Sequence, residues 1–290
     1  MKIIKPYYKI VTDISDGGIK ELQFIEQAAR TCYKSEDKIT QDGESAKALI
    51  KQLIKSGHEA MLEHSSLSVK FVVDRGISHE LVRHRLFSFA QESSRYVNYS
   101  KDKFGNEITF IEPIFYQATE EHFEDAVLID RYEEWVEACQ DAEKSYFRLL
   151  KMGASAQEAR NVLPNSTKTE IVVTGNYREW RHFFKLRTDK AAHPQMREVA
   201  IPLLKELQRR IPIVFDDIRV VDVEQMTHNK EGRPLAYWYA PASYKSEEYC
   251  SNCHERTRSE GDDGEKYCIN CGAEMIDEQA YRKMHDRGLC

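Results

Sequence analysis

The spacing of hydrophobic residues along the chain predicts several amphipathic helices. Apolar positions three and four residues apart predict helices over residues 18–34, 45–56 and about 120–152. Gly57 and Gly153 follow the second and third of these segments, as expected where a helix stops. Ser155-x-x-Glu158 matches a capping box, which predicts the start of a further short helix.

Strands are predicted where apolar residues alternate with polar ones. Residues 67–73 follow this pattern, and shorter strand-like segments occupy 108–111 and 168–174. Ser78 is expected to cap a helix that ends near residue 85, 177–189 is expected to be helical, and Pro194 suits the first turn of another helix. We therefore expect an α/β fold of the α+β type, in which helices flank an antiparallel sheet.

Composition indicates a soluble globular protein, because 41% of the 290 residues are hydrophobic and 31% are charged. No run of about 20 apolar residues is present, so no membrane span is predicted. The first residues show no signal-peptide pattern. We expect a cytoplasmic location.

The net charge of −6 is concentrated near the C-terminal end. Residues 246–277 hold nine acidic and three basic side chains, while the rest of the chain has 39 of each sign. A neutral main body does not present a general field for polyanions, so its arginine clusters are expected to be local binding devices and nucleic acid an improbable partner.

Four of the seven cysteines form two C-x2-C pairs, Cys250/Cys253 and Cys268/Cys271. This spacing predicts a structural zinc ribbon over 246–277, in which four thiolates hold the metal and leave no open position. Residues 233–245 are expected to be a linker and 278–290 a tail. The other cysteines are scattered, as expected in a reducing compartment. Docking of a partner or another subunit is our hypothesis for the ribbon.

Arginines gather in two places in the main body. The segment 83–96, RHRLFSFAQESSRY, places three guanidinium groups among aromatic and hydroxyl side chains. A second polar series contains Arg160, Asn176 and Arg187. Each arginine alone would be interpreted as a solvated helix-surface residue, but a guanidinium grips phosphate or carboxylate bidentately. No G-x-G occurs, so a Rossmann or Walker phosphate loop is not expected.

The order of these motifs resembles the flavin-dependent thymidylate synthases. Arg83-His84-Arg85 followed after seven residues by Ser93 matches the RHR-x7-S signature of that family. The segments 57–64 (GHE…EH), 159–164 (ARNVLP) and 186–190 (LRTDK) follow its pattern in order, so the resemblance covers roughly Ala28 to Arg210. The chain departs from many relatives at four positions, namely Gln91, His182, Ala191 and His193.

The resemblance implies a catalytic domain over 1–232 that binds FAD and dUMP. The residues implied to hold FAD are His58, Arg83, His84, Arg85, Asn176 and His182. Those implied to hold dUMP are Gln91, Ser93, Ser94, Arg95, Arg160 and Arg187. In this family methylenetetrahydrofolate supplies a methylene unit to C5 of dUMP, NADPH reduces the flavin, and the active sites lie between subunits of a homotetramer.

Arg187 and Ser93 are the candidate catalytic residues. A nucleophilic serine needs a neighbouring base, and the adjacent Arg95 cannot be that base. Ser93 is therefore expected to be a phosphate or base ligand, and Arg187 to stabilise negative charge on uracil. Two alternatives stay open: a related flavin-dependent modification of dUMP, such as hydroxymethylation, and a zinc-ribbon protein that binds nucleic acid.

Overall fold

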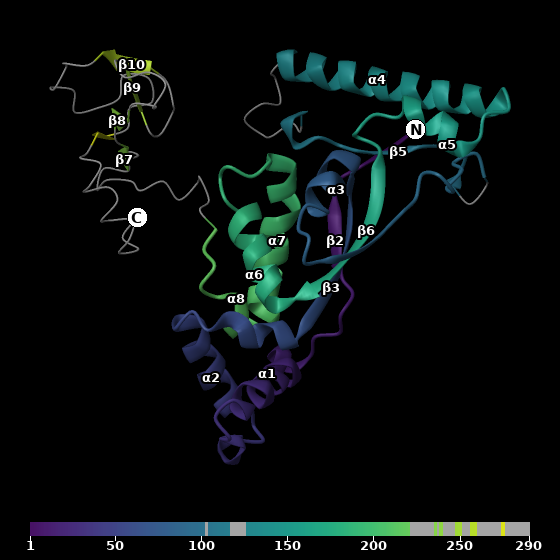
Figure 1. Ribbon diagram of the computed structural model, residues 1–290. Helices are drawn as coiled ribbons and strands as arrows, with labels where there is room; N and C mark the ends of the chain where they lie inside the picture. Colours follow the sequence, from purple (N-terminus) through teal and green to yellow (C-terminus); the bar gives the residue numbers. More distant parts are fainter. Residues whose placement is uncertain are drawn as a thin grey trace. The chain divides into compact units, whose positions relative to one another are not determined.

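The computed structural model describes residues 1–101, 104–116 and 126–220, together with short strand segments between 235 and 275 (Figure 1). The chain divides into two compact units, Met1–Val220 and Val221–Cys290.

The centre of the first unit is a four-stranded antiparallel sheet. Its order is β2 (Tyr7–Ile10), β3 (Ser66–Asp74), β6 (Lys168–Asn176) and β4 (Ser88–Gln91). β3 and β6 pair along their full length. Two further strands, β1 (Lys2–Ile4) and β5 (Thr109–Ile111), form a parallel pair. This arrangement confirms the expected mixed fold with an antiparallel sheet.

The helices follow the predicted order. They are α1 (Ile19–Thr31), α2 (Glu44–Lys55), α3 (Arg75–Leu81), α4 (Ala126–Lys151), α5 (Ala156–Ala159), α6 (Tyr177–Arg187), α7 (Pro194–Arg210) and α8 (Pro212–Phe215). Short 3-10 turns include η3 (Glu59–His64), η5 (Ile114–Tyr116) and η7 (Arg160–Val162). The predicted capping box opens α5, where Glu158 Oε2 accepts from the Ser155 backbone N–H at 2.8 Å.

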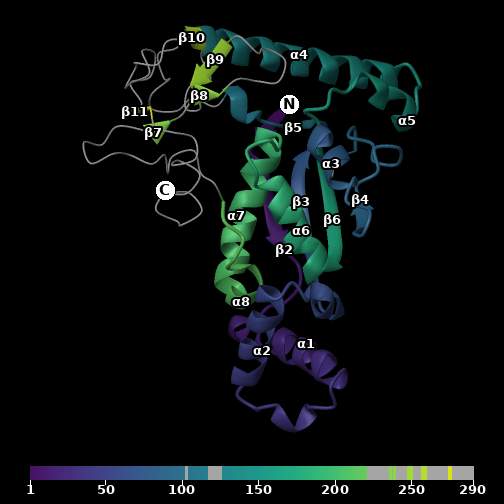
Figure 2. The ribbon, with the colours of Figure 1, turned by 60° about the vertical axis from the view of Figure 1, so that its left-hand side comes forward.

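Helices α6 and α7 cover one face of the sheet (Figures 1 and 2). Because side chains alternate along a strand, Val69 and Phe71 of β3 point to this face and are fully buried. Phe71 stacks against Trp180 of α6 with ring centroids 6.3 Å apart. On the opposite face the Ser68 and Thr174 hydroxyls hydrogen-bond at 2.8 Å. The prediction of a half-buried strand is confirmed.

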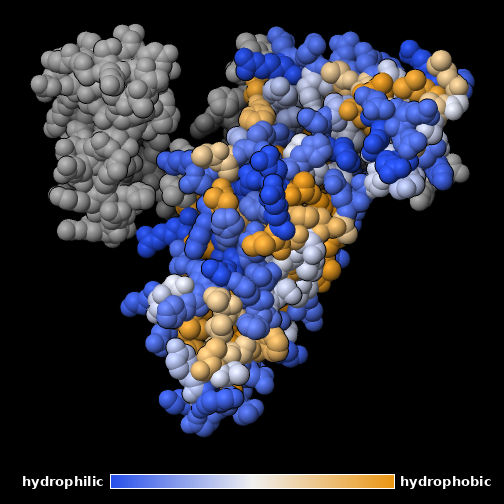
Figure 3. All heavy atoms as spheres, in the orientation of Figure 1, coloured by the Kyte–Doolittle hydropathy of each residue, from blue (hydrophilic) through white to orange (hydrophobic). Residues whose placement is uncertain are grey.

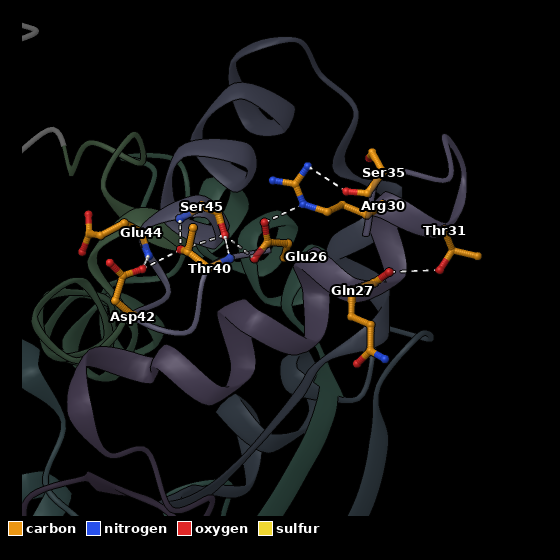
Figure 4. Close-up of polar contacts among 9 residues, drawn as sticks. All are labelled: Glu26, Gln27, Arg30, Thr31, Ser35, Thr40, Asp42, Glu44 and Ser45. Carbon is orange, nitrogen blue, oxygen red and sulfur yellow. Dashed lines mark hydrogen bonds and ion pairs between the residues drawn. The ribbon is translucent and has the colours of Figure 1, made fainter. Parts of the chain in front are cut away.

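A buried carboxylate ties α1 to α2. Glu26 is fully buried and accepts from Arg30 Nε at 2.7 Å and from Ser45 Oγ at 2.9 Å (Figure 4). A buried charge is tolerated when it is paired and hydrogen-bonded.

The face of the molecule seen in Figure 3 is hydrophilic over most of the described residues, with smaller apolar patches.

The start of α3 differs from the sequence prediction. Asp74, not Ser78, is the N-cap, because its Oδ1 accepts from the Ile77 backbone N–H at 2.8 Å. Ser78 lies inside the helix and donates to the Arg75 carbonyl at 2.8 Å. Because Asp74 precedes Ser78 in the chain, its carboxylate at the end of β3 accepts from the backbone N–H groups of the first turn, and the helix begins before Ser78. The helix ends at Leu81, so the three residues 83–85 lie in a loop.

The described residues of the second unit form two small sheets. β8 (Trp238–Tyr239), β9 (Glu247–Cys250) and β10 (Arg256–Ser259) are antiparallel, and β7 (Leu235–Ala236) pairs with β11 (Glu274–Met275) in parallel. Cys250 is the last residue of β9. Cys253, Cys268 and Cys271 lie outside the described residues, as does the predicted tail.

Among the residues that the structure describes, no group of three or more histidine, cysteine or acidic side chains is arranged to hold a metal ion. No helix within the same ranges has the length and apolar character needed to cross a membrane.

Candidate active site

A cleft of about 1350 Å³ lies between the loop that follows α3 and helix α6. Its cationic and imidazole lining comes from Arg83, His84, Arg85, Arg178, His182, Lys185, Arg187 and His193. Its carboxylates are Glu59, Glu63, Glu80 and Glu179, and the remaining lining residues are Leu86, Asn176, Leu186, Ala191 and Ala192. Five of the six residues implied to hold FAD are therefore brought together. His58 is exposed and does not line the cleft, although the next residue does.

Phe87 anchors the loop that carries the first arginine cluster. Its ring is buried 4.6 Å from the ring of Trp180, and its backbone N–H donates to the His84 carbonyl at 3.0 Å. The ring also lies directly on Gly175 of β6, where an added Cβ would overlap with it. The loop is thus fixed against the sheet, while the neighbouring Leu86 is 77% exposed and lines the cleft.

Arg187 belongs to the residues implied to hold dUMP, and it also lines the cleft and bonds to His84, which is implied to hold FAD. Its Nε donates to His84 Nε2 at 2.9 Å, and its terminal nitrogens donate to the Glu80 carboxylate at 2.8 Å and to the Glu80 carbonyl at 3.3 Å. The guanidinium is therefore held by two elements before any ligand binds. A preorganised donor stabilises developing charge without having to reorient.

His84 is neutral in this environment. Burial lowers its pKa to about 4, and the nearby charges of Arg187 and His182 add to the effect. A guanidinium only donates, so His84 Nε2 must be the acceptor of the Arg187 bond. The single ring proton then resides on Nδ1, which lies 3.6 Å from Glu179 Oε1.

Most cations of the cleft already have a carboxylate partner. Arg178 pairs with Glu63 at 2.5 Å, and Lys185 lies 3.5 Å from Glu59. Arg83 and Arg85, in contrast, are exposed, and no ion pair ties them to another side chain in the described part of the chain. These two guanidinium groups are therefore the ones that are available to a phosphate.

Residues implied to hold dUMP gather outside the cleft lining. Arg160 donates to Ser94 Oγ at 3.0 Å, which connects η7 to the segment after β4. Gln91 uses its amide nitrogen to donate to Ser78 Oγ at 2.9 Å, which leaves its carbonyl oxygen for a ligand. Arg95 is exposed and lies over the Tyr96 ring at 5.4 Å. Arg187 alone of this set lines the cleft.

No activated protein nucleophile is found among the described residues of this site. Ser93 Oγ accepts from the Arg95 backbone N–H at 3.4 Å and has no histidine or carboxylate bonded to it. Burial raises the pKa of the Cys139 thiol to about 11, so it stays protonated inside α4. Cys32 lies at the exposed end of α1, and Cys290 is outside the described residues.

Glu80 and Glu179 are site residues that sequence reasoning missed. No motif singled out Glu80, because its bonds to Arg187 depend on tertiary contact between α3 and α6. Glu179 stands three residues after Asn176, a spacing that suggests a capping box. The structure shows only half of that motif: Asn176 Oδ1 accepts from the Glu179 backbone N–H at 2.8 Å.

The cleft has the chemistry that a flavin dinucleotide needs. Free guanidinium groups suit the pyrophosphate, and the exposed side chains of Leu86 and Leu186 offer apolar contact to a planar ring. The cleft thus defines a protein that binds an anionic ligand with a flat apolar part, which is the class to which nucleotide cofactors belong.

Comparison with known proteins agrees with this class. The family model described as "Thymidylate synthase complementing protein" matches residues 19–213. The chain is 36% identical over 222 residues to the flavin-dependent thymidylate synthase of Corynebacterium aurimucosum, covering 74% of this chain and 87% of that relative. It is 34% identical to that of Mycolicibacterium vanbaalenii over 223 residues, covering 71% and 82%. The chain therefore belongs to the flavin-dependent thymidylate synthase family.

A solved structure shares the fold. The UMP/dUMP methylase PolB from Streptomyces cacaoi, bound with 5-bromo-dUMP, matches with a TM-score of 0.58 and 26% sequence identity. The match covers 74% of this chain and 96% of that one.

Proposed function

We propose that this chain catalyses the reductive methylation of dUMP to dTMP, with methylenetetrahydrofolate as the carbon donor, FAD as the hydride carrier and NADPH as the reductant. The methylene carbon would bond to C5 of uracil while its bonds to the folate nitrogens break, so that tetrahydrofolate leaves and C5 loses its proton. The flavin, reduced by NADPH, would supply the hydride that turns the methylene into the methyl group. The observation that carries the proposal is the cleft in which Arg187 bonds to the RHR segment. Membership in the family and the nucleotide named in the PolB structure support it.

The cleft residues would hold the flavin by charge and by shape. Arg83 and Arg85 would bind the pyrophosphate, and Asn176 would donate through the amide nitrogen that its capping bond does not use. His182 is exposed at the cleft wall and would contact the same cofactor. His58 would reach it only from outside the described lining. The bound flavin supplies the hydride chemistry, and the protein supplies orientation.

Arg187 would act on the pyrimidine. A guanidinium has five N–H donors, and the three bonds to His84 and Glu80 leave two for a ligand. Directed at the O2/N3 edge of uracil, these donors would stabilise the negative charge that develops as C5 becomes nucleophilic. Ser93, Ser94, Arg95, Arg160 and Gln91 would bind the rest of dUMP.

A homotetramer would join the two ligand sets. Within one chain, Arg160 and Ser94 form their cluster outside the cleft that holds Arg83 and Arg85. The nucleotide cluster of one copy facing the flavin cleft of another would complete each site. This arrangement explains why one chain presents two half-sites and not a single closed pocket.

We also propose that the C-terminal part of the chain forms a zinc ribbon. Cys250 ends strand β9, which is where the first knuckle of a ribbon would begin. Thiolates of Cys250, Cys253, Cys268 and Cys271 would hold a structural zinc ion in a reducing, cytoplasmic environment. We expect that Cys250→Ser combined with Cys271→Ser releases the metal. Unchanged zinc in the purified variant, measured by mass spectrometry, would rule out the four-thiolate site.

The first test is the visible absorption spectrum of the purified protein with and without dUMP. A flavin band that shifts when dUMP is added is the expected result. A protein that stays colourless after incubation with FAD would contradict the proposal. The mass of the product then separates the methyl product from a hydroxymethyl one, because both reactions would start from the same complex.

A further inference from the structure

The side chain of Glu179 is not explained by helix capping or by an ion pair with a cation. It occupies the third position of α6, where a glutamate normally reaches back to the N-cap backbone. The residue is only 6% exposed and lines the cleft, and its Oε1 lies 3.6 Å from His84 Nδ1. His182, on the same helix, is near enough for its charge to act on this carboxylate. Burial raises the pKa of Glu179, so the carboxylate is kept in this place at a cost.

His84 stands between this carboxylate and Arg187. Its Nε2 accepts from Arg187 Nε at 2.9 Å, so its Nδ1 carries the proton and faces Glu179. The hydrogen bond made by one ring nitrogen of a histidine decides the protonation of the other. The 3.6 Å separation is longer than an N–H···O hydrogen bond, so a small movement when ligand fills the cleft would be needed to close it.

We propose that Glu179 is a positioning residue that fixes the Nδ1–H tautomer and the orientation of His84, and through His84 directs the guanidinium of Arg187. Glu80 holds the other side of the same guanidinium at 2.8 Å. Arg187 is thus clamped between two carboxylates, one in direct contact and one acting through an imidazole. The inference about catalysis rests on the proposed function, in which Arg187 contacts uracil.

Two substitutions at position 179 separate this role from a general contribution to folding. In Glu179→Gln, the amide oxygen still accepts from Nδ1–H, so we expect turnover within about threefold of the wild type. In Glu179→Ala, the acceptor is lost and we expect kcat to fall by about tenfold or more, with flavin still bound. The capping bond uses the backbone of residue 179 and survives in both variants.

The direct readout is the ring nitrogens of His84. Magic-angle-spinning spectra of FAD-loaded protein, labelled with 15N only in histidine rings, report which nitrogen carries the proton when the cleft is filled, and His84→Asn assigns the signal. We expect Glu179→Ala to populate a second tautomer or orientation and Glu179→Gln to keep the wild-type signal. The matched control is Glu44→Ala, an exposed first-turn glutamate of α2 that pairs with Lys47 at 2.6 Å.

Wild-type His84 signals and wild-type kcat in Glu179→Ala would overturn the inference. Because the spectra need neither substrate nor turnover, this failure is distinct from failure of the proposed function. If Glu179→Ala shifts the His84 signal but the wild-type protein forms no dTMP, the positioning role of Glu179 is supported and the proposed thymidylate synthase activity is contradicted.

Discussion

Arg187 Nε donates to His84 Nε2 across 2.9 Å, although 103 positions separate the two residues in the chain. His84 belongs to the set implied to bind flavin, and Arg187 to the set implied to bind the nucleotide. Their direct bond couples the two sets, so a change at His84 should affect nucleotide turnover through Arg187.

Arg187→Ala should abolish turnover while flavin stays bound. The change removes two donors from the proposed uracil edge, and the loss of one preorganised donor commonly costs about 100-fold or more in kcat. Arg187→Lys, which keeps the charge but not the fork, should rescue little. Turnover of dUMP measures the loss of catalysis, and the flavin absorbance of the purified variants measures whether flavin is retained. Flavin lost together with activity would contradict the assigned role.

Arg160→Ala should weaken dUMP binding by about tenfold or more, because a charged hydrogen-bond donor is lost near Ser94. Flavin content should not change. Titration of the flavin spectrum with dUMP gives the affinity.

Mixing Arg160→Ala with Arg187→Ala subunits provides a sharper test of shared sites. If each site takes its nucleotide cluster and its cleft from different subunits, some sites of a mixed assembly regain both intact halves and activity returns. Activity that stays absent after verified subunit exchange would argue for sites built within one chain.

His84 should make the fold less stable in acid. Its pKa is about 4 in the fold and about 6.5 in an unfolded chain, so between these values only the unfolded state binds the proton. Stability should therefore fall as the pH falls, by about 2 kcal/mol between pH 7.5 and pH 5 from this group alone. His84→Asn should remove that part of the slope in urea unfolding, whereas the exposed control His64→Asn should keep it.

Gly175→Ala should displace the Phe87 ring and with it the loop of residues 83–85. Overpacking of this kind typically costs about 1–3 kcal/mol, and we expect flavin affinity to fall as well. Adding Phe87→Leu should recover part of both losses, because the smaller side chain relieves the overlap. Strictly additive effects in the double variant would show that the two residues are not coupled.

Arg181→Met should be strongly destabilising. Arg181 is fully buried and donates to both oxygens of Asp217, at 2.6 and 2.7 Å, and to Glu59 at 2.9 Å. Removing one partner of a buried ion pair commonly costs about 3–5 kcal/mol, and the loss here should lie toward the lower end because the Asp217 side chain is 48% exposed. Arg178→Met is the matched control on the same helix, since its pair with Glu63 is about half exposed and should contribute less than about 1 kcal/mol. Urea unfolding of both variants compares the two losses.

Elements with a local signal could be predicted from the sequence. The periodic spacing of α1 and α2, the alternation in β3 and the capping box of α5 all depend on residues a few positions apart. β2 and β4 escaped prediction, because each is four residues long and is defined by pairing with distant strands. The cap of α3 was assigned to the wrong residue because Asp74-Arg75-Gly76 also fits a turn.

The candidate site likewise contains residues that the sequence could identify and residues that depend on contacts between distant parts of the chain. Motif resemblance pointed to Arg83, Asn176 and Arg187, and the structure places these in one cleft. It could not reveal Glu80 or Glu179, whose contacts cross between α3, the following loop and α6. Side-chain partners at such distances in the chain are set by packing, which no short sequence pattern encodes.

The pairing of lysine and arginine with glutamate in the cleft has a consequence for selectivity. Three cations carry their own counter-ion, so a small anion such as inorganic phosphate must compete with tethered carboxylates for them. Among the described arginines and lysines that line the cleft, Arg83 and Arg85 are the two that can accept a new anion without such an exchange. A ligand gains enough binding free energy only if it also covers the apolar side chains beside these two arginines. The cleft therefore selects molecules that join a phosphate to a flat ring.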